Sequence, residues 1–132
     1  VLGKLGCRRA LVVHGEDGMD EITTTGSSHV AEWQDGRVRQ YTVHPEDFGI
    51  PVGTIDEIRG GNAEENAHII LELFRGKKGG KRDIVLLNAG AALFAAGSAH
   101  TIETGIEIAR QAIDDGKALE KLQVVIRHSN RQ

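Results

Sequence analysis

The chain has 132 residues, of which 39% are hydrophobic and 27% charged, and its formal net charge is −3 at pH 7. This composition fits one folded, mildly acidic domain, and it excludes a disordered tail and a collagen-like repeat. The single cysteine excludes an internal disulfide, and the longest apolar run (residues 84–96) is shorter than the ~20 residues that cross a bilayer. The mildly acidic charge balance does not attract nucleic acid. We therefore expect a cytoplasmic protein without membrane or nucleic-acid partners.

The first half of the chain is expected to form strands. Residues 10–14 are a short apolar, β-branched run that ends at Gly15, which is typical of a buried strand leading into a polar loop. We find no parallel neighbour for this strand within the chain and expect its partner to lie in a missing N-terminal part. Residues 22–25 form a second β-prone stretch, which ends at a turn cluster over residues 26–28.

A β-hairpin is the clearest local signal. Two β-prone runs, residues 29–34 and 37–43, are separated only by Asp35 and Gly36, which predicts a two-residue type I′ turn. The resulting register joins partners of matching chemistry: Gln34 with Arg37, Trp33 with Val38, Glu32 with Arg39, and Val30 with Tyr41. A loop over residues 45–51 is expected to follow, because Pro45 cannot donate a ladder hydrogen bond.

The second half is expected to form about four helices. Asn62 and Glu65 predict a capping box for the first, whose apolar face we assign to Ala67, Ile70, Leu71 and Phe74. Asp83 opens a buried helix through residue 96, although residues 84–87 alone are also compatible with a strand. Thr101 is expected to cap a third helix with one apolar face, formed by Ile102, Ile106, Ala109 and Ile113. The fourth runs over residues 117–128.

The densest polar cluster follows the first predicted strand. Residues 14–21 read HGEDGMDE, and ligand sites in open α/β sheets lie beyond the carboxyl ends of strands. Carboxylates this close repel one another, and a divalent cation or surrounding water must relieve the repulsion. Hard oxygen ligands favour Mg²⁺ over zinc. Asp20 and Glu21 are the candidate metal ligands, because they are adjacent and come just after the glycine of this cluster. An acidic surface turn that binds no ion is the alternative.

Three other polar features have simpler interpretations. Gly60 and Gly61 precede a helix start that could bind an anion, but an ordinary N-cap at Asn62 explains them better. The basic run over residues 75–82 is interpreted as a solvated loop. Asn88 lies in an apolar helix, where its amide needs partners, and is interpreted as a polar packing contact.

Five blocks of sequence also resemble the anthranilate phosphoribosyltransferase family, and they occur in the family's order along nearly the whole chain. They are ALVVHGEDGMDEI (10–22), PEDFG (45–49), GGNAEENA (60–67), LLNAGAAL (86–93) and AIDDGKA (112–118). Each block alone is weak evidence, and five in sequence are specific.

The resemblance implies an enzyme of tryptophan biosynthesis that transfers the phosphoribosyl group of phosphoribosyl pyrophosphate to anthranilate, with Mg²⁺ and release of pyrophosphate. The family's adjacent acidic pair, which holds Mg²⁺ on the pyrophosphate, falls on Asp20 and Glu21. The implied fold is α/β, a partial nucleoside phosphorylase/phosphoribosyltransferase-type catalytic domain with a β-hairpin in its first half and about four helices in its second.

The family's pyrophosphate-binding glycine loop, its Lys-His-Gly-Asn-Arg segment and its anthranilate-binding arginine do not occur here. Residues 1–132 are therefore expected to be the C-terminal part of one catalytic domain. The resemblance implies that a helical N-terminal domain, through which the parent would form a homodimer, and the first part of the large domain lie outside this sequence. Since catalysis by positioning needs both halves of a site, we expect the isolated chain to be inactive. The alternative is a non-catalytic fragment or family relative that acts as a binding module.

Overall fold

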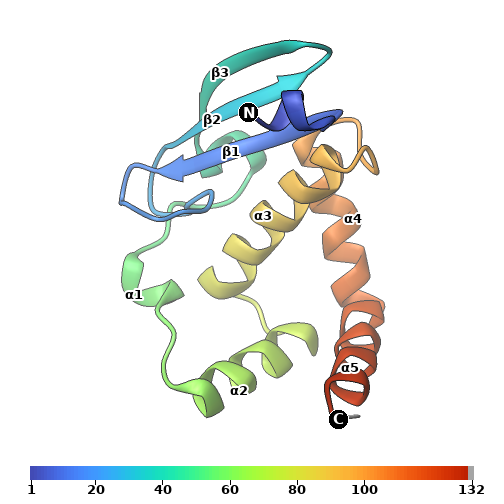
Figure 1. Ribbon diagram of the computed structural model, residues 1–132. Coiled ribbons are helices and arrows are strands. Elements are labelled where there is room, and N and C mark those ends of the chain that lie inside the picture. The colour runs from blue at the N-terminus through green and yellow to red at the C-terminus, as the bar shows by residue number, and fades with distance from the viewer. Residues whose placement is uncertain (131–132) are drawn as a thin grey trace.

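The computed structural model describes residues 1–130 and has two layers, a sheet and a group of helices against one of its faces (Figure 1). The elements follow in this order: η1 (Leu2–Leu5), β1 (Arg9–Gly15), β2 (Ser28–Gln34), β3 (Arg37–Val43), η2 (Pro45–Phe48), α1 (Ile55–Ile58), α2 (Ala63–Phe74), α3 (Gly80–Ala95), α4 (Ile102–Asp114) and α5 (Lys117–Ser129). The mixed α/β class expected from the sequence is confirmed. The short elements η1, η2 and α1 were not predicted.

The hairpin forms as the sequence predicts. Asp35 and Gly36 both have positive φ angles, 50° and 80°, as a type I′ turn requires. β2 and β3 pair antiparallel, with Trp33 opposite Val38 and Glu32 opposite Arg39. Local turn chemistry therefore sets this register.

β1 has an antiparallel partner within the chain, which the sequence did not predict. β1 pairs antiparallel with β2 along its whole length, from Arg9 opposite Gln34 to Gly15 opposite Ser28. The loop over residues 16–27 reverses the chain direction, so the sheet is an antiparallel meander in the order β1-β2-β3. The other edge of β1 has no strand partner among residues 1–130.

Residues 22–25 do not form the β-prone stretch that their composition indicates. Their backbone groups bond to side chains and to a distant loop instead of to a strand. The N–H of Thr23 donates to Ser28 Oγ at 2.9 Å, and the carbonyl of Thr24 accepts from the N–H of Gly53 at 2.9 Å. These residues are buried all the same, with Ile22 only 1% exposed, because they lie between the sheet and the helices.

The core lies between the sheet and helices α3 and α4. Alternate residues of β1, including Leu11 and Val13, face this layer. The third predicted helix is confirmed as α4, with Thr101 Oγ1 accepting from the N–H of Thr104 at 3.1 Å. The residues of its predicted apolar face are all buried: Ile102, Ile106, Ala109 and Ile113.

Two of the predicted helices differ in detail from expectation. α3 begins at Gly80, because the carbonyl of Gly79 accepts from the N–H groups of Arg82 and Asp83. Arg82 is therefore not part of a solvated loop: it is buried, and its Nη2 lies 2.7 Å from Asp114 Oδ1.

No helix among the described residues is long and apolar enough to cross a membrane.

The buried face of α2 is the second difference. Of the predicted face, Phe74 packs against the core and Leu71 is half-buried, but Ile70 is 42% exposed and Ala67 is exposed. The buried residue of α2 is Leu73, which lies outside that face. The helix carries two overlapping apolar stripes, and the periodicity alone does not choose which one meets the core. The expected cap is confirmed: Asn62 Oδ1 accepts from the N–H of Glu65, and Glu65 Oε2 accepts from the N–H of Asn62.

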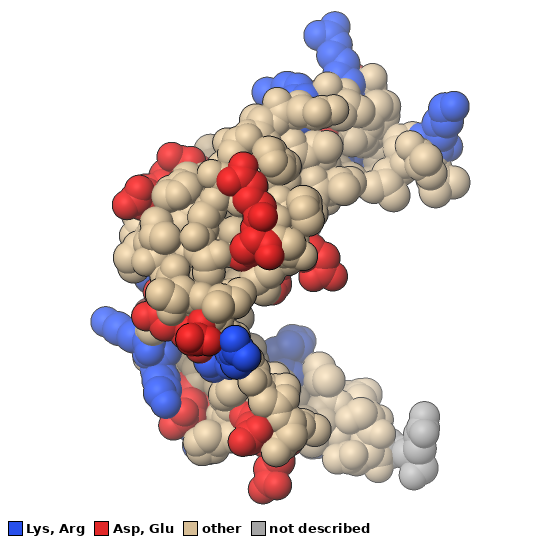
Figure 2. Space-filling view, turned by 90° about the vertical axis from the view of Figure 1, so that its left-hand side faces the viewer, with Lys and Arg blue, Asp and Glu red and all other residues tan. Residues whose placement is uncertain are grey.

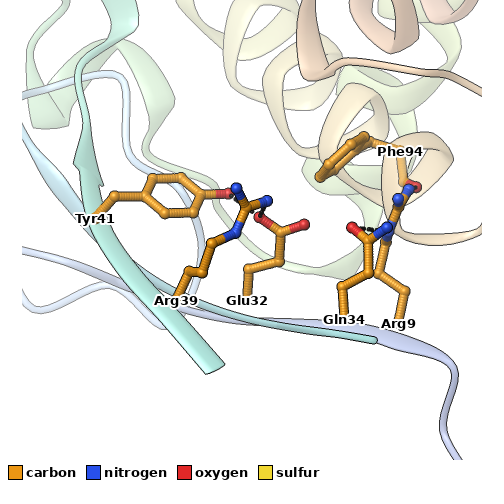
Figure 3. Close-up of polar contacts among 6 residues, drawn as sticks. All are labelled: Arg9, Glu32, Gln34, Arg39, Tyr41 and Phe94. Carbon is orange, nitrogen blue, oxygen red and sulfur yellow. Dashed lines mark hydrogen bonds and ion pairs between the residues drawn. The ribbon is translucent and has the colours of Figure 1, made fainter. Parts of the chain in front are cut away.

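A polar cluster lies on the helix-facing side of the sheet (Figure 3). Glu32 is 2% exposed, and its Oε2 accepts from Arg39 Nη2 at 3.1 Å and from the Tyr41 hydroxyl at 3.2 Å. Arg9 donates to the carbonyl of Phe94 at 2.8 Å, and its guanidinium lies 4.4 Å from the centre of that ring. The contacts of Glu32 thus join β2 to β3, and those of Arg9 hold the sheet against the C-terminal end of α3.

The Tyr41 hydroxyl predicts a loss of stability in alkaline solution. Burial, followed by the charge and hydrogen bond of Glu32, raises the pKa of Tyr41 from 10.0 to about 12. The unfolded chain therefore releases this proton first, and the stabilisation is complete below pH 10 and lost as the pH rises toward 12. Because the chain has one tyrosine, tyrosinate absorbance measures this pKa directly. A folded-state value near 10 would contradict the prediction, and Tyr41→Phe should flatten the decline of unfolding free energy.

Candidate functional site

The candidate site is the loop that follows β1. The N–H of Gly15 donates to the carbonyl of Met19 at 2.9 Å, and the N–H of Gly18 donates to the carbonyl of Gly15 at 2.9 Å. These two bonds close a tight turn directly at the end of the strand. The next two residues, Asp20 and Glu21, leave the turn toward the surface, with Asp20 exposed and Glu21 partly buried.

Asp17 braces this turn internally. Its Oδ2 accepts from the hydroxyls of Thr23 and Thr25 at 2.5 Å and 2.6 Å, and its Oδ1 accepts from the N–H of Met19 at 3.1 Å. Partial burial raises the pKa of Asp17, but these hydrogen bonds together outweigh it, and the net pKa is lowered. The carboxylate of Asp17 is thus ionised and engaged, and it holds residues on both sides of Asp20 and Glu21.

Asn88 of α3 holds the loop from beneath. Its Oδ1 accepts from the N–H of Ile22 at 2.9 Å, and its Nδ2 donates to the carbonyl of Ile22 at 2.8 Å and to that of Ile84 at 3.0 Å. The interpretation of Asn88 as a polar packing contact is therefore confirmed. Its partner is the residue that directly follows Glu21.

Asp20 and Glu21 differ from the other acids of the loop in having unengaged oxygens. Among residues 1–130, neither carboxylate takes part in a hydrogen bond or an ion pair, whereas Asp17 is fully engaged and Glu16 Oε1 lies 3.5 Å from His29 Nε2. The structure thus separates one bracing carboxylate from two adjacent ones that remain available to a ligand. Figure 2 shows acidic side chains gathered on this face of the molecule, above Lys and Arg side chains at the level of α1.

The donor set fits Mg²⁺ better than a metal that is enclosed by protein. No group of three or more His, Cys, Asp or Glu side chains in the described part of the chain is arranged to hold a metal ion. Mg²⁺ is commonly bound by one or two carboxylates, with waters and substrate phosphates completing its coordination. Asp20 and Glu21 supply two hard oxygen donors of that kind, while zinc in proteins takes three or four nitrogen or sulfur ligands.

The other polar candidates are accounted for by the fold. The amide of Gly61 donates to Asn66 Oδ1 at 2.8 Å, and Asn62 caps α2, so the N-cap interpretation of this glycine loop is confirmed. Sequence reasoning missed the bracing role of Asp17 and its partners Thr23 and Thr25. An Asp that precedes Gly is typical of a side chain that accepts from the backbone two residues later, but nothing local identifies its two threonine partners.

Comparison with known proteins assigns the chain to a family. Residues 1–119 match the model described as "Glycosyl transferase family, a/b domain". The chain belongs to this family. Within it, the chain is 50% identical over 130 residues to the anthranilate phosphoribosyltransferase of Acetivibrio thermocellus, and the match covers 98% of this chain and 38% of that protein.

Solved structures of the family share the fold. Anthranilate phosphoribosyltransferase from Thermus thermophilus superposes with a TM-score of 0.83 and 36% identity, over 92% of this chain and 36% of that one. The Saccharomyces cerevisiae enzyme in complex with PRPP and Mg has a TM-score of 0.76 and 23% identity, over 86% of this chain and 33% of that one. This chain therefore spans well under half the length of the proteins that it matches.

Proposed function

We propose that this chain is part of an anthranilate phosphoribosyltransferase, in which it supplies the metal-binding carboxylates. The longer protein would transfer the phosphoribosyl group of phosphoribosyl pyrophosphate to the amine of anthranilate and release pyrophosphate. The observation that carries the proposal is the unengaged pair Asp20 and Glu21 at the end of β1, in a chain 50% identical to a protein of that name. The S. cerevisiae homologue, solved with PRPP and Mg, agrees with this substrate and metal.

The proposed role of the pair is electrostatic. Bound Mg²⁺ would neutralise the charge that develops on pyrophosphate as its bond to the ribose carbon breaks. Asp20 and Glu21 would hold the metal from one side, and the substrate's phosphate oxygens would complete the coordination from the other. No side chain of this loop needs to act as a nucleophile, because the amine of anthranilate attacks the ribose carbon.

The proposal extends to the whole protein as the resemblance implies. We infer that the longer protein is a cytoplasmic homodimer and that residues 1–132 form the C-terminal part of its catalytic domain. The chain by itself carries the carboxylates but none of the family's other substrate-binding blocks. A non-catalytic binding module is the competing proposal, and only an assay separates the two.

Pyrophosphate release from anthranilate and phosphoribosyl pyrophosphate is the deciding measurement. The longer protein that contains this chain should release pyrophosphate in a reaction that depends on both anthranilate and Mg²⁺. The 132-residue chain should release none above the uncatalysed rate, because positioning catalysis needs both halves of the site. Turnover by the chain alone would show that its own residues complete the site. No turnover by the longer protein would favour the binding module.

A further inference from the structure

Asn88 bonds to the backbone of the residue that directly follows the candidate metal ligands. Asn88 lies on α3, 66 positions beyond Ile22 in the sequence, and it bonds to both backbone groups of Ile22. Ile22 follows Glu21 directly and is 1% exposed. The backbone at this point is consequently fixed on both its N–H and its C=O side by one amide.

The amide of Asn88 has little freedom of its own. Its Nδ2 also donates to the carbonyl of Ile84 on the preceding turn of α3 at 3.0 Å, which defines its rotamer and the assignment of its oxygen and nitrogen. Reversing the amide would put its NH₂ group against the N–H of Ile22 and its oxygen against two carbonyls. The side chain therefore acts as a directed clamp.

The helix that carries Asn88 is itself held in register. α3 meets α4 at two glycines, and a Cβ on Gly90 would lie 2.7 Å from the backbone nitrogen of Ile106 and 3.0 Å from the carbonyl oxygen of Ile102. Such close backbone contact prevents α3 from sliding or rotating against α4. The position of Asn88, and with it that of Ile22, is thus set by the helix layer.

We propose that Asn88 is a positioning residue that sets the direction of the Asp20 and Glu21 carboxylates toward the metal. The inference rests on the proposed function. Asp17 bonds to Met19 and Thr23 on the two sides of the pair, while Asn88 is the contact that connects it to the rigid helix layer. Groups behind metal ligands orient them, and their loss typically lowers metal affinity by ~10–100-fold. We expect about a tenfold loss, since Asn88 acts through the backbone.

The test measures metal binding separately from turnover. In the longer protein, Mn²⁺ affinity in the presence of pyrophosphate is followed by water proton relaxation in wild type, Asn88→Ala and Asp20→Asn. Asn88→Ala should weaken Mn²⁺ binding about tenfold, raise the Mg²⁺ concentration that gives half-maximal turnover, and leave the KM for anthranilate unchanged. The amide of Ile22 should also exchange faster with solvent, because its acceptor is lost.

Two controls make the result decisive. Ile113→Ala on α4 removes buried core volume and should lower stability. If its Mn²⁺ affinity equals that of wild type, a general effect of lower stability is excluded. If Asn88→Ala does not fold, Asn88→Ser keeps a neutral polar side chain at this position, and its single hydroxyl donor cannot serve the carbonyls of both Ile22 and Ile84. Weakened binding in Asp20→Asn with unchanged binding in the Asn88 variants would overturn this inference alone. Unchanged binding in Asp20→Asn would overturn the proposed function.

Discussion

Replacing Asp20 by Asn is expected to lower the kcat of the longer protein at least about tenfold, because a preorganised charge interaction of this kind typically contributes ~2–4 kcal/mol in the transition state. The substitution keeps the size of the side chain and removes its negative charge. Asp20 is exposed, and its side chain makes no hydrogen bond or ion pair with the described residues that the substitution could remove, so the fold and its stability should not change. Steady-state turnover as a function of Mg²⁺ concentration measures the effect.

Glu16→Gln is the matched control for Asp20→Asn. It also removes one carboxylate charge from the same loop, but Glu16 lies within the turn that precedes Asp20 and Glu21, with its side chain 54% exposed beside His29. Turnover and Mg²⁺ dependence should be near the wild-type values in this variant, since charge–charge effects between exposed groups are small. Wild-type rates and Mg²⁺ dependence in Asp20→Asn would refute the assignment of the metal ligands.

The features predicted correctly from sequence are those that neighbouring residues determine. The hairpin register depends on two turn residues, Asp35 and Gly36, whose positive φ angles bring the flanking strands together in one way only. The capping interactions at Asn62 and Thr101 act within four residues. In each case the chemistry that forms the element is contained in a short window of the sequence.

The features that sequence reasoning missed depend on contacts between distant residues. The stretch over residues 22–25 has the composition of a strand, but Asn88 and Gly53 take up its backbone groups, so it stays a loop. The buried face of α2 is a second example. Its apolar residues form two overlapping stripes, one with Leu73 and one with Ile70, and periodicity alone does not show which stripe meets the core. The sequence could identify Asn88 as a side chain that needs partners, but only the fold identifies the partner.

The candidate site combines both situations. Four neighbouring acids were visible in the sequence, and both their arrangement and the resemblance selected Asp20 and Glu21 among them. The contacts of the loop give an independent reason for the same choice, since Asp17 and Glu16 have partners whereas Asp20 and Glu21 have none among the described residues. The metal-binding role of the pair remains a prediction, and the hydrogen bonds of Asp17 and Asn88 explain how a surface loop would hold two like charges in one place.

Gly105→Ala is expected to destabilise the protein by about 2 kcal/mol or more, although alanine is the better helix former by ~1 kcal/mol. Gly105 on α4 faces Gly90 on α3, and a Cβ at this position would overlap the carbonyl group of Gly90. The obstructing atoms belong to a helix backbone and cannot rotate away as a side chain would. The two helices must therefore separate, which opens the core between them.

Urea denaturation followed by circular dichroism measures this change in the free energy of unfolding. Gly26→Ala is the matched control, because a Cβ on Gly26 would meet no atom within 4 Å, and it should leave the unfolding midpoint nearly unchanged. A midpoint for Gly105→Ala equal to or above wild type would mean that α3 and α4 adjust at no cost. In that case the helix layer would not be rigid enough to fix Asn88, and the clamp on Ile22 would lose its support as well.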